Sequence, residues 1–438
     1  MTSVTEIGQA LKTVLSTVAD TVGRATGFTK RESKLTGGKF AQTTVLGWLH
    51  KPEASLDELS QAGASVGVTI SAQGLDQRFT PEAAVLLEQI LNSALGQIIA
   101  SEPVAIPLLQ RFNGVIVQDS SIISLPDALV KVWQGCGDSN GHHVAALKLQ
   151  VRFDLLNGTL YGPLLENGRT NDRGSALQDA PLPIGALRIA DLGYFSLEQL
   201  RAFDDQGAYF LTRLYLQTAL FDQAGAQLAL STILEAAPTG QVELLVHIGA
   251  AQRLPVRLLA VQVPQEVADR RRQKLRAEAR RKGETPSRVR LAFAQWTILV
   301  TNVPADKLTL AEAIVLARVR WQIELLFKLW KSHGKVDEWR SQKPWRILCE
   351  TYAKLIAMVI QHWLFLVSCW VYPNRSLVKA AKTVRDYVPM LESALAGLLD
   401  ITVPIEQIKR CLSAGGRLNR RSKEPNTYQL LLDITTVA

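Results

Sequence analysis

The sequence of 438 residues contains few cysteines and no spacing that would join them. Cys136, Cys349, Cys369 and Cys411 are scattered along the chain, and no two of them form a Cys-x-x-Cys pair. This spacing excludes a disulfide framework and a cysteine-based structural zinc site. The sequence therefore predicts a protein of a reducing compartment, and we expect it in the cytoplasm.

Long apolar runs are also scarce. Residues 1–24 carry Glu6, Lys12 and Asp20 in an amphipathic pattern and lack the unbroken apolar segment of a secretory signal. Only residues 355–372 approach the length of a membrane span, and polar residues 361 and 362 lie at the middle, where lipid makes them costly. We predict a buried core helix and no membrane partner, with a membrane-anchored helical protein as the alternative.

Compositional bias is absent, and one sign of charge is in excess. Hydrophobic residues make up 47% and charged residues 20%, which is typical of a soluble globular protein. At roughly 150 residues per domain the length accommodates two or three domains. Lys and Arg total 49 against 40 Asp and Glu, a net charge of +9, which favours a polyanionic partner such as nucleic acid.

The pattern of residues 1–100 predicts a mostly helical N-terminal region. Ser55 can cap one helix, residues 63–67 supply a turn, and Ser71 can cap a second helix. That second helix would carry four polar side chains: Gln73, Asp76, Gln77 and Arg78. The spacing is typical of a helix-turn-helix, while a helical pair with a solvated face explains these residues equally well.

The rest of the chain predicts an α/β fold with a mixed sheet flanked by helices. Strand candidates are residues 114–121, 143–156, 186–195 and 208–216, followed by an antiparallel set at 227–234, 241–249 and 256–264, and by 295–303. Residues beyond 309 are predicted helical. We expect five regions: 1–100, a first core part at 101–213, a β-rich insertion with a basic segment at 214–300, a second core part at 301–375, and a helical C-terminal region at 376–438.

Two of the predicted strands end at a carboxylate. Asp119 follows the apolar run 115–117, and Asp191 follows the run 187–190 before a turn and a capping pattern at Ser196 and Gln199. A lone aspartate after a strand is usually a turn or a cap. Two neighbouring strands that both end in this way can place two carboxylates side by side, which implies a bound cation or a shared proton.

A helix predicted from Thr309 to Gly334 carries a third carboxylate. At about 100° per residue, Glu324, Lys328 and Lys331 fall within about 80° of Arg320, and the remaining surface is mostly apolar. A solvated stripe of ion pairs is the ordinary explanation. A helix that is apolar over most of its circumference seldom faces bulk water, so we expect this stripe to line a cleft that handles phosphate.

Three carboxylates of this kind are suited to hard divalent cations. Asp119, Asp191 and Glu324 would hold two Mg²⁺ ions about 4 Å apart, and Mn²⁺ can replace Mg²⁺. Such a pair activates a water or a 3′-hydroxyl and stabilises the leaving oxygen. Arg320 and Lys331, with Lys328 beside them, would bind nucleic-acid phosphates.

These residues resemble a known family. Asp119, Asp191 and the helix Arg320-x3-Glu324-x6-Lys331 are similar to bacterial insertion-sequence transposases that have an RNase H-like core, a DDE triad and a Tyr-x2-Arg-x3-Glu-x6-Lys signature. The Tyr position is Ala317, which departs from the signature. The likeness covers most of the chain from about residue 25 and includes residues 70–80, 207–214, 295–304, 320–332, 351–364 and 420–432.

The resemblance implies a function that composition alone does not show. It implies a transposase that cuts double-stranded DNA at the terminal inverted repeats, passes through a hairpin and joins the 3′ ends to target DNA as a homodimer. The N-terminal region would recognise the repeats, with Gln73, Gln77 and Arg78 as contacts, and Trp296 would stack on a flipped base. A core aromatic is the alternative for Trp296. The protein would act in the bacterial cytoplasm, at the nucleoid.

Two further points stay open from the sequence. The segment 270–290 contains ten Lys or Arg residues, which indicates either a solvated helix or a contact to DNA phosphates. The absent tyrosine at position 317 leaves room for a catalytically inactive DNA-binding derivative of a transposase.

Overall fold

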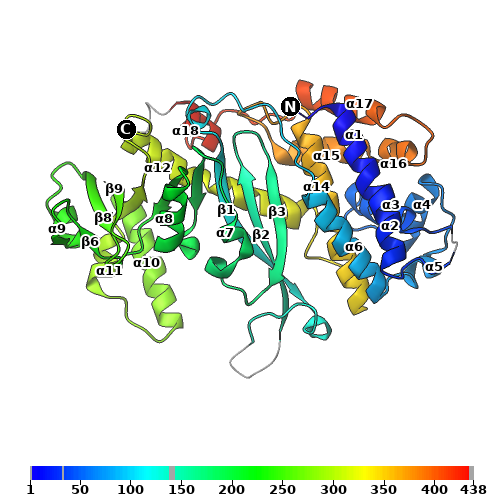
Figure 1. Cartoon of the computed structure of the whole chain (residues 1–438), viewed down its shortest axis with the longest axis horizontal. Helices are drawn as coiled ribbons and strands as arrows, with labels where there is room; N and C mark the ends of the chain where they lie inside the picture. The colour runs from blue at the N-terminus through cyan, green and yellow to red at the C-terminus, as the bar shows by residue number, and fades with distance from the viewer. Residues whose placement is uncertain (1, 32–33, 138–143, 434–438) are drawn as a thin grey trace. The chain divides into compact units, whose positions relative to one another are not determined.

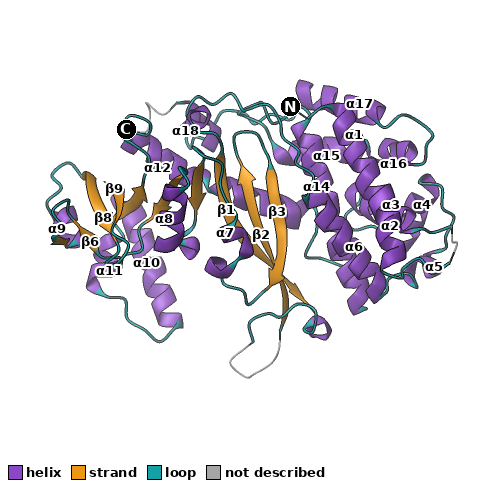
Figure 2. Cartoon of the chain, in the orientation of Figure 1, coloured by secondary structure: helices purple, strands orange, loops and turns teal. Residues whose placement is uncertain are grey.

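A computed structural model of the chain describes residues 2–31, 34–137 and 144–433 (Figure 1). The fold is α/β with a mixed sheet, as predicted, and Figure 2 shows its strands among many helices. The ten strands are hydrogen-bonded in the order β3-β2-β1-β4-β5-β10-β9-β8-β6-β7.

The described residues form two compact units. The first contains those within 1–110, 119–170 and 321–429, and the second those within 111–118, 171–320 and 430–438. Strand β1 (Val115–Leu125) passes from the second unit into the first after Gln118.

The first unit is mainly helical. Its N-terminal part contains α1 (Val4–Lys12), the π-helical segment η1 (Thr13–Val18), α2 (Ala19–Ala25), α3 (Gly37–His50), α4 (Leu56–Ser65), α5 (Ala72–Asp76), α6 (Pro81–Leu95) and η2 (Leu109–Arg111), whose last residue lies in the other unit. Its later part contains η3 (Asp127–Leu129), α13 (Trp321–Lys328), η6 (Leu329–His333), α14 (Pro344–Leu366), α15 (Leu377–Asp386), α16 (Val388–Leu395), α17 (Thr402–Ala414) and α18 (Thr427–Leu432), whose end lies in the other unit.

Helix α14 is the centre of this unit, and helices from the start of the chain, α3 and α6, pack against it (Figure 1). Every residue from Ile347 to Leu366 is buried. The imidazole of His362 finds a partner inside the protein, since Nε2 lies 2.7 Å from the carbonyl oxygen of Gly158. The prediction of a buried core helix is therefore confirmed for residues 355–366, whereas residues 367–372 lie beyond the end of α14. Among the described residues, none of the helices combines the length and the apolarity that crossing a membrane requires.

The first unit also contains β2 (Ala145–Asp154) and β3 (Leu160–Asn167), which pair in antiparallel register. The sequence pattern did not predict β3, because it contains Gly162 and Pro163, residues that are depleted in strands. The register shifts opposite them, between Gln150 and Arg152, and Gly162 has φ +99°, a conformation that favours glycine.

The second unit contains the remaining strands and fewer helices. Its strands are β4 (Leu187–Ala190), β5 (Tyr209–Arg213), β6 (Leu220–Phe221), β7 (Gln227–Leu228), β8 (Gln241–Ile248), β9 (Leu254–Gln262) and β10 (Trp296–Thr301). Its helices are η4 (Asp172–Gly174), α7 (Ala176–Asp179), η5 (Leu192–Tyr194), α8 (Leu197–Asp205), α9 (Leu230–Glu235), α10 (Gln265–Arg281), α11 (Arg288–Phe293) and α12 (Leu310–Val319).

Parallel and antiparallel pairing meet in this sheet. Strand β4 pairs with β1 and with β5 in parallel, whereas β10 pairs with β5 and β9 in antiparallel register. The predicted antiparallel set is correct for β8 and β9. It is wrong for residues 227–234, because only Gln227 and Leu228 form a strand and the next residues form α9, which buries Leu230 and Leu234 on one helical face.

Candidate active site

The structure corrects the expected position of Asp119. Strand β1 does not end there but continues to Leu125, so Asp119 lies in the middle of an 11-residue strand. The change at this point is one of environment, because residues 115–118 are buried and residues 119–121 are only partly buried. The Oδ1 atom of Asp119 accepts a hydrogen bond from the backbone N–H of Ser120 at 2.9 Å.

Asp191 follows its strand as predicted. It comes directly after β4 and stands at the N-cap position of the short 3₁₀ helix η5. Its side chain is exposed and makes no capping hydrogen bond, so the carboxylate is not used to begin that helix. In the parallel ladder Gln118 pairs with Ala190. Asp119 therefore directly follows the paired residue Gln118, and Asp191 directly follows its partner Ala190.

A buried polar network of the second unit links β4 to β1 at Gln118, the residue before Asp119. Arg188 of β4 is 2% exposed and donates from Nε to Oε1 of Gln118 at 3.0 Å, and from Nη2 to Oε1 of Gln178 at 2.6 Å. Gln178 in turn donates to the carbonyl oxygen of Tyr194, in the turn after Asp191, at 3.1 Å. Sequence analysis missed these residues. The only signal was the charge of Arg188 in a run otherwise typical of a buried strand.

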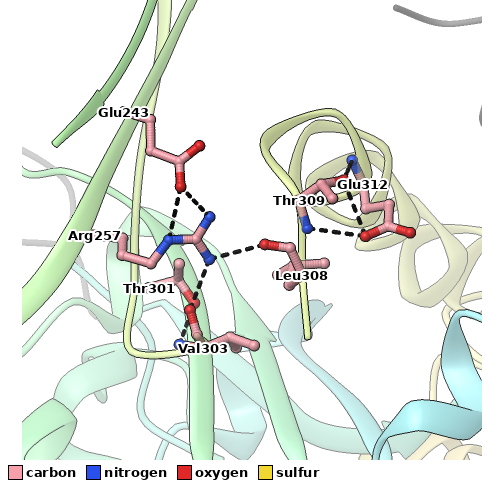
Figure 3. A network of polar contacts seen from close by, with 7 residues as sticks. All are labelled: Glu243, Arg257, Thr301, Val303, Leu308, Thr309 and Glu312. Carbon is pink, nitrogen blue, oxygen red and sulfur yellow. Dashed lines mark hydrogen bonds and ion pairs between the residues drawn. The ribbon is translucent and has the colours of Figure 1, made fainter. Parts of the chain in front are cut away.

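A second arginine holds the segment that leads to the third acid. Arg257 of β9 forms an ion pair with Glu243 of β8 and donates to the carbonyl oxygens of Val303 and Leu308 at 2.7 and 2.8 Å (Figure 3). The arginine therefore joins two strands to the loop before α12.

Helix α12 begins immediately after that loop, at the predicted capping box. The hydroxyl of Thr309 accepts from the N–H of Glu312 at 3.3 Å, and the Glu312 carboxylate accepts from the N–H of Thr309 at 2.9 Å (Figure 3). Arg111 also pairs with Glu312 at 2.8 Å. Burial by itself would raise the pKa of the Glu312 carboxyl, but the hydrogen bonds, first among them the one from Arg111, lower it overall.

The expected continuous helix from Thr309 to Gly334 is interrupted. Helix α12 ends at Val319 with Arg320 as its cap, and α13 begins at Trp321 and carries Glu324. From Leu329 the backbone forms the π-helical segment η6, whose wider turn changes the angle per residue. The regular-helix calculation therefore does not hold from Arg320 to Lys331. Its prediction of apolar burial is also wrong at Trp321 and Leu325, which are 55% and 40% exposed.

Lys331 bonds within the first unit. Its Nζ donates to the carbonyl oxygen of Ile122 in β1 at 2.7 Å and lies 3.9 Å from Oδ2 of Asp337. The lysine predicted to bind phosphate thus contacts the strand that contains Asp119, three residues further along. Lys328 is exposed on α13. The proximity of Asp337 had no signal in the sequence pattern.

Trp296 is buried rather than presented to a ligand. It begins β10, is 7% exposed, and belongs to the core of the second unit with Leu258 and Ile298. This position agrees with the core-aromatic alternative. A base-stacking role stays a prediction that requires the indole to leave that core.

The predicted recognition helix of the N-terminal region is shorter than expected. Ser71 caps α5 as predicted, but α5 ends at Asp76, so Gln77 is its C-cap and Arg78 lies beyond it. The guanidinium of Arg78 lies 4.6 Å from the centre of the Phe28 ring and donates to the Phe28 carbonyl oxygen. Asp76 forms ion pairs with Lys343 and Arg346 at the start of α14, and the hydrogen bond from Lys343 lowers the pKa of its carboxyl.

Exposed polar and basic side chains lie on the surface around α5. Gln73 and Gln77 are exposed, and Gln77 and Arg78 line a cavity of about 400 Å³ with Lys30 and Arg31. Lys30 and Arg31 also line a second cavity of about 840 Å³, together with Arg24 and Lys34. The N-terminal region thus offers a basic surface to an anionic ligand.

The donor set of the three acids is compatible with a hard divalent cation, because all the donors are carboxylate oxygens and Asp191 is exposed and not committed to a cap. Among the described residues, no group of three or more His, Cys, Asp or Glu side chains is gathered as a metal site. The assignment of Asp119, Asp191 and Glu324 as metal ligands therefore stays a prediction.

Comparison with known proteins identifies the family. Residues 110–360 match the sequence model of the family described as "Transposase DDE domain". The chain is 28% identical over 446 residues to the transposase for insertion sequence element IS231F of Bacillus thuringiensis subsp. israelensis, covering 94% of this chain and 91% of the relative. It is 24% identical to the transposase for insertion sequence element IS1151 of Clostridium perfringens over 385 residues, covering 82% and 78%. The chain therefore belongs to the transposase DDE domain family and is an enzyme that acts on DNA.

Proposed function

We propose that this transposase cuts double-stranded DNA at the terminal inverted repeats of an insertion sequence and joins the freed 3′ ends to target DNA. In the first step water attacks the scissile phosphorus and the 3′-oxygen leaves. In the second the freed 3′-hydroxyl attacks a phosphorus of the target strand, and the 3′-oxygen of that strand leaves. The observation that carries the proposal is the register of β1 and β4, in which both aspartates directly follow paired residues.

Asp119, Asp191 and Glu324 are the proposed catalytic residues, because the two aspartates directly follow the paired residues of β1 and β4 and Glu324 is the carboxylate of α13. Neighbouring parallel strands lie about 4.8 Å apart, and the paired residues Gln118 and Ala190 directly precede Asp119 and Asp191. The hydrogen bond from Lys331 Nζ to the carbonyl oxygen of Ile122 supports including Glu324, because it joins the helical segment that follows Glu324 to the strand that contains Asp119.

The proposed cofactor is a pair of Mg²⁺ ions, replaceable by Mn²⁺, held by these three carboxylates. When bound, divalent ions polarise the phosphate and stabilise the attacking and leaving oxygens. Arg320 and Lys331 would bind the phosphates of the scissile strand, with Lys328 beside them. Lys331 would exchange its present bond to a backbone carbonyl for one to phosphate.

The decisive experiment is cleavage of a labelled inverted-repeat fragment by Glu324→Gln, Asp119→Asn and Asp191→Asn variants in Mg²⁺ or Mn²⁺. Each variant should lose cleavage and keep binding of the fragment, because the amide preserves the shape of the side chain and removes its charge. Glu406→Gln is the control, since this partly exposed acid of α17 pairs with Lys409 and has no proposed role. Metal-dependent nicking retained by Glu324→Gln would refute its assignment.

The alternative is a DNA-binding derivative without activity, which Ala317 at the usual tyrosine position suggests. Ala317 lies in α12, where a methyl group supplies neither the packing nor the hydroxyl of tyrosine. Wild-type protein that binds the fragment and yields no product over a range of salt would favour this alternative. Ala317→Tyr tests it further, because restored cleavage would locate the defect.

We also propose that cleavage passes through a DNA hairpin and that a homodimer holds two ends at the nucleoid of a bacterial cell. A hairpin would be detected as a covalently closed product on a denaturing gel. Light scattering of the protein with and without end DNA would measure the assembly. If no covalently closed product is found at any time point of the reaction, the hairpin proposal is wrong, while the proposal of cleavage is unaffected.

A further inference from the structure

The basic segment 270–290 contains cations of two kinds, which only the structure separates. Arg271 and Arg272 are partly buried and hold α10 to its neighbours. Arg271 donates to the carbonyl oxygen of Trp296 at 2.9 Å and to the hydroxyl of Thr297 at 3.1 Å. Arg272 donates from Nε to the carbonyl oxygen of Leu291 in α11 at 3.3 Å and pairs with Asp269 of its own helix at 2.8 Å. These two side chains are part of the fold.

The other eight cations form an exposed set, which we call the basic face: Arg270, Lys274, Arg276, Arg280, Arg281, Lys282, Arg288 and Arg290. Within the part of the chain that the structure describes, none of the eight makes an ion pair. The acid nearest in sequence to the start of this face, Asp269, is occupied by Arg272. Three cations in succession at residues 280–282 repel one another, so the cluster lowers its free energy when a polyanion binds.

The geometry of α10 arranges part of the basic face in a row. At about 100° per residue, Arg270, Lys274 and Arg281 lie within about 40° of one another, on the side opposite the buried Ala268 and Ala279. The row is about 16 Å long at a rise of 1.5 Å per residue. Duplex DNA carries one charge per about 1.7 Å of its axis, so several phosphates lie within that length.

We propose that the basic face binds the phosphodiester backbone of duplex DNA without regard to base sequence. The inference rests on the proposed function, which makes DNA the substrate, and adds a surface that uses none of the candidate catalytic residues. Six of its eight cations are arginines, whose planar forks match phosphate oxygens in pairs. Such contacts fix the position of a duplex and specify no sequence.

The test is the salt dependence of DNA binding by the full chain without divalent metal. Arg280→Ala/Arg281→Ala/Lys282→Ala should bind more weakly, and the slope of log affinity against log salt should decrease by about 0.9 for each phosphate that the variant no longer neutralises. Two probes are used: an inverted-repeat duplex and an unrelated duplex of equal length. Both should weaken by the same factor, because backbone contacts carry no sequence information.

A matched control removes three exposed charges elsewhere, in Lys12→Ala/Lys382→Ala/Arg410→Ala. Its slope should stay close to that of the wild type. A second variant, Arg288→Ala/Arg290→Ala, changes the face on α11 and covers the case in which the triple variant unfolds. An unchanged slope in both basic-face variants, or a loss confined to the inverted-repeat probe, would overturn the proposal.

Failure of this inference and failure of the proposed function are distinguishable. If the wild type cleaves the inverted repeat and the basic-face variants keep the wild-type salt slope, the proposed role of the basic face is wrong and the catalytic assignment stands. If the basic-face variants have reduced salt slopes and the wild type never cleaves, the role of the basic face stands and the catalytic assignment is wrong. A wild-type protein that binds neither duplex but binds an acidic protein would contradict both.

Discussion

At the scale of single residues, buried polar groups are held by partners far away in the sequence. Lys354 of α14 donates to the carbonyl oxygens of Lys335 and Glu338 at 3.0 and 2.7 Å and to the Glu350 carboxylate at 2.8 Å. Burial lowers the pKa of the Lys354 ammonium and raises that of the Glu350 carboxyl. In each group the charge of the partner acts against the effect of burial. Lys354 thereby holds the loop that follows η6 and Lys331.

Arg188→Met is expected to destabilise the second unit. The change leaves the Oε1 atoms of Gln118 and Gln178 without the donors that Arg188 supplies, in a buried place. We expect the free energy of unfolding to fall by about 3 kcal/mol, measured by urea denaturation. Arg188→Lys should restore only part of this free energy, because a lysine ammonium does not reproduce the two hydrogen bonds of the planar guanidinium. A loss below about 0.5 kcal/mol in Arg188→Met would show that the network is not needed.

Glu392→Gln is expected to stabilise the protein at alkaline pH. Burial raises the pKa of the Glu392 carboxyl from 4.5 to about 7, opposed by a hydrogen bond from Ser65. The native state therefore binds the proton more tightly than the unfolded chain, and stability falls as pH rises from about 4.5 through 7. The variant should gain about 3 kcal/mol near pH 8 and nothing near pH 4, by urea denaturation. Glu406→Gln should leave the pH profile unchanged, and a Glu392→Gln profile equal to that of the wild type would contradict the shift.

At the scale of elements, local signals predicted helix starts well. The capping patterns at Ser55, Ser71, Thr309 and Ser196 each begin a helix, because a cap is satisfied within three residues. Interruptions within helices were not predictable. The break at Arg320 and the π-helical segment η6 have no proline or glycine to signal them, so packing determines them.

Gly37→Ala should disrupt the packing of α3 on α2. A Cβ at Gly37 would lie 2.1 Å from the carbonyl oxygen of Ala19, and backbone cannot yield as a flexible side chain does. We expect a loss of about 3 kcal/mol in the free energy of unfolding. Gly96→Ala is the control, since its Cβ would meet no atom closer than 3.4 Å and its φ is −73°. Equal stability of the two variants would contradict the close approach.

At the scale of the whole molecule, two compact units with separate buried networks should unfold separately. We predict two calorimetric transitions. Glu392→Gln should move only the transition of the first unit, and Arg188→Met only that of the second, because each substitution lies within one unit. A single transition that both variants move equally would show that the units unfold together.

The sequence by itself determined the α/β class, most strands and the helix caps, because each depends on residues near one another in the chain. Only the tertiary structure decided which cations are exposed at 270–290, that Trp296 is buried, that Trp321 is exposed and that Gln118 pairs with Ala190. Those facts depend on contacts such as the one from Arg188 to Gln118, 70 residues apart. A local pattern carries no information on partners at that separation, since packing selects them only when the whole sheet is formed.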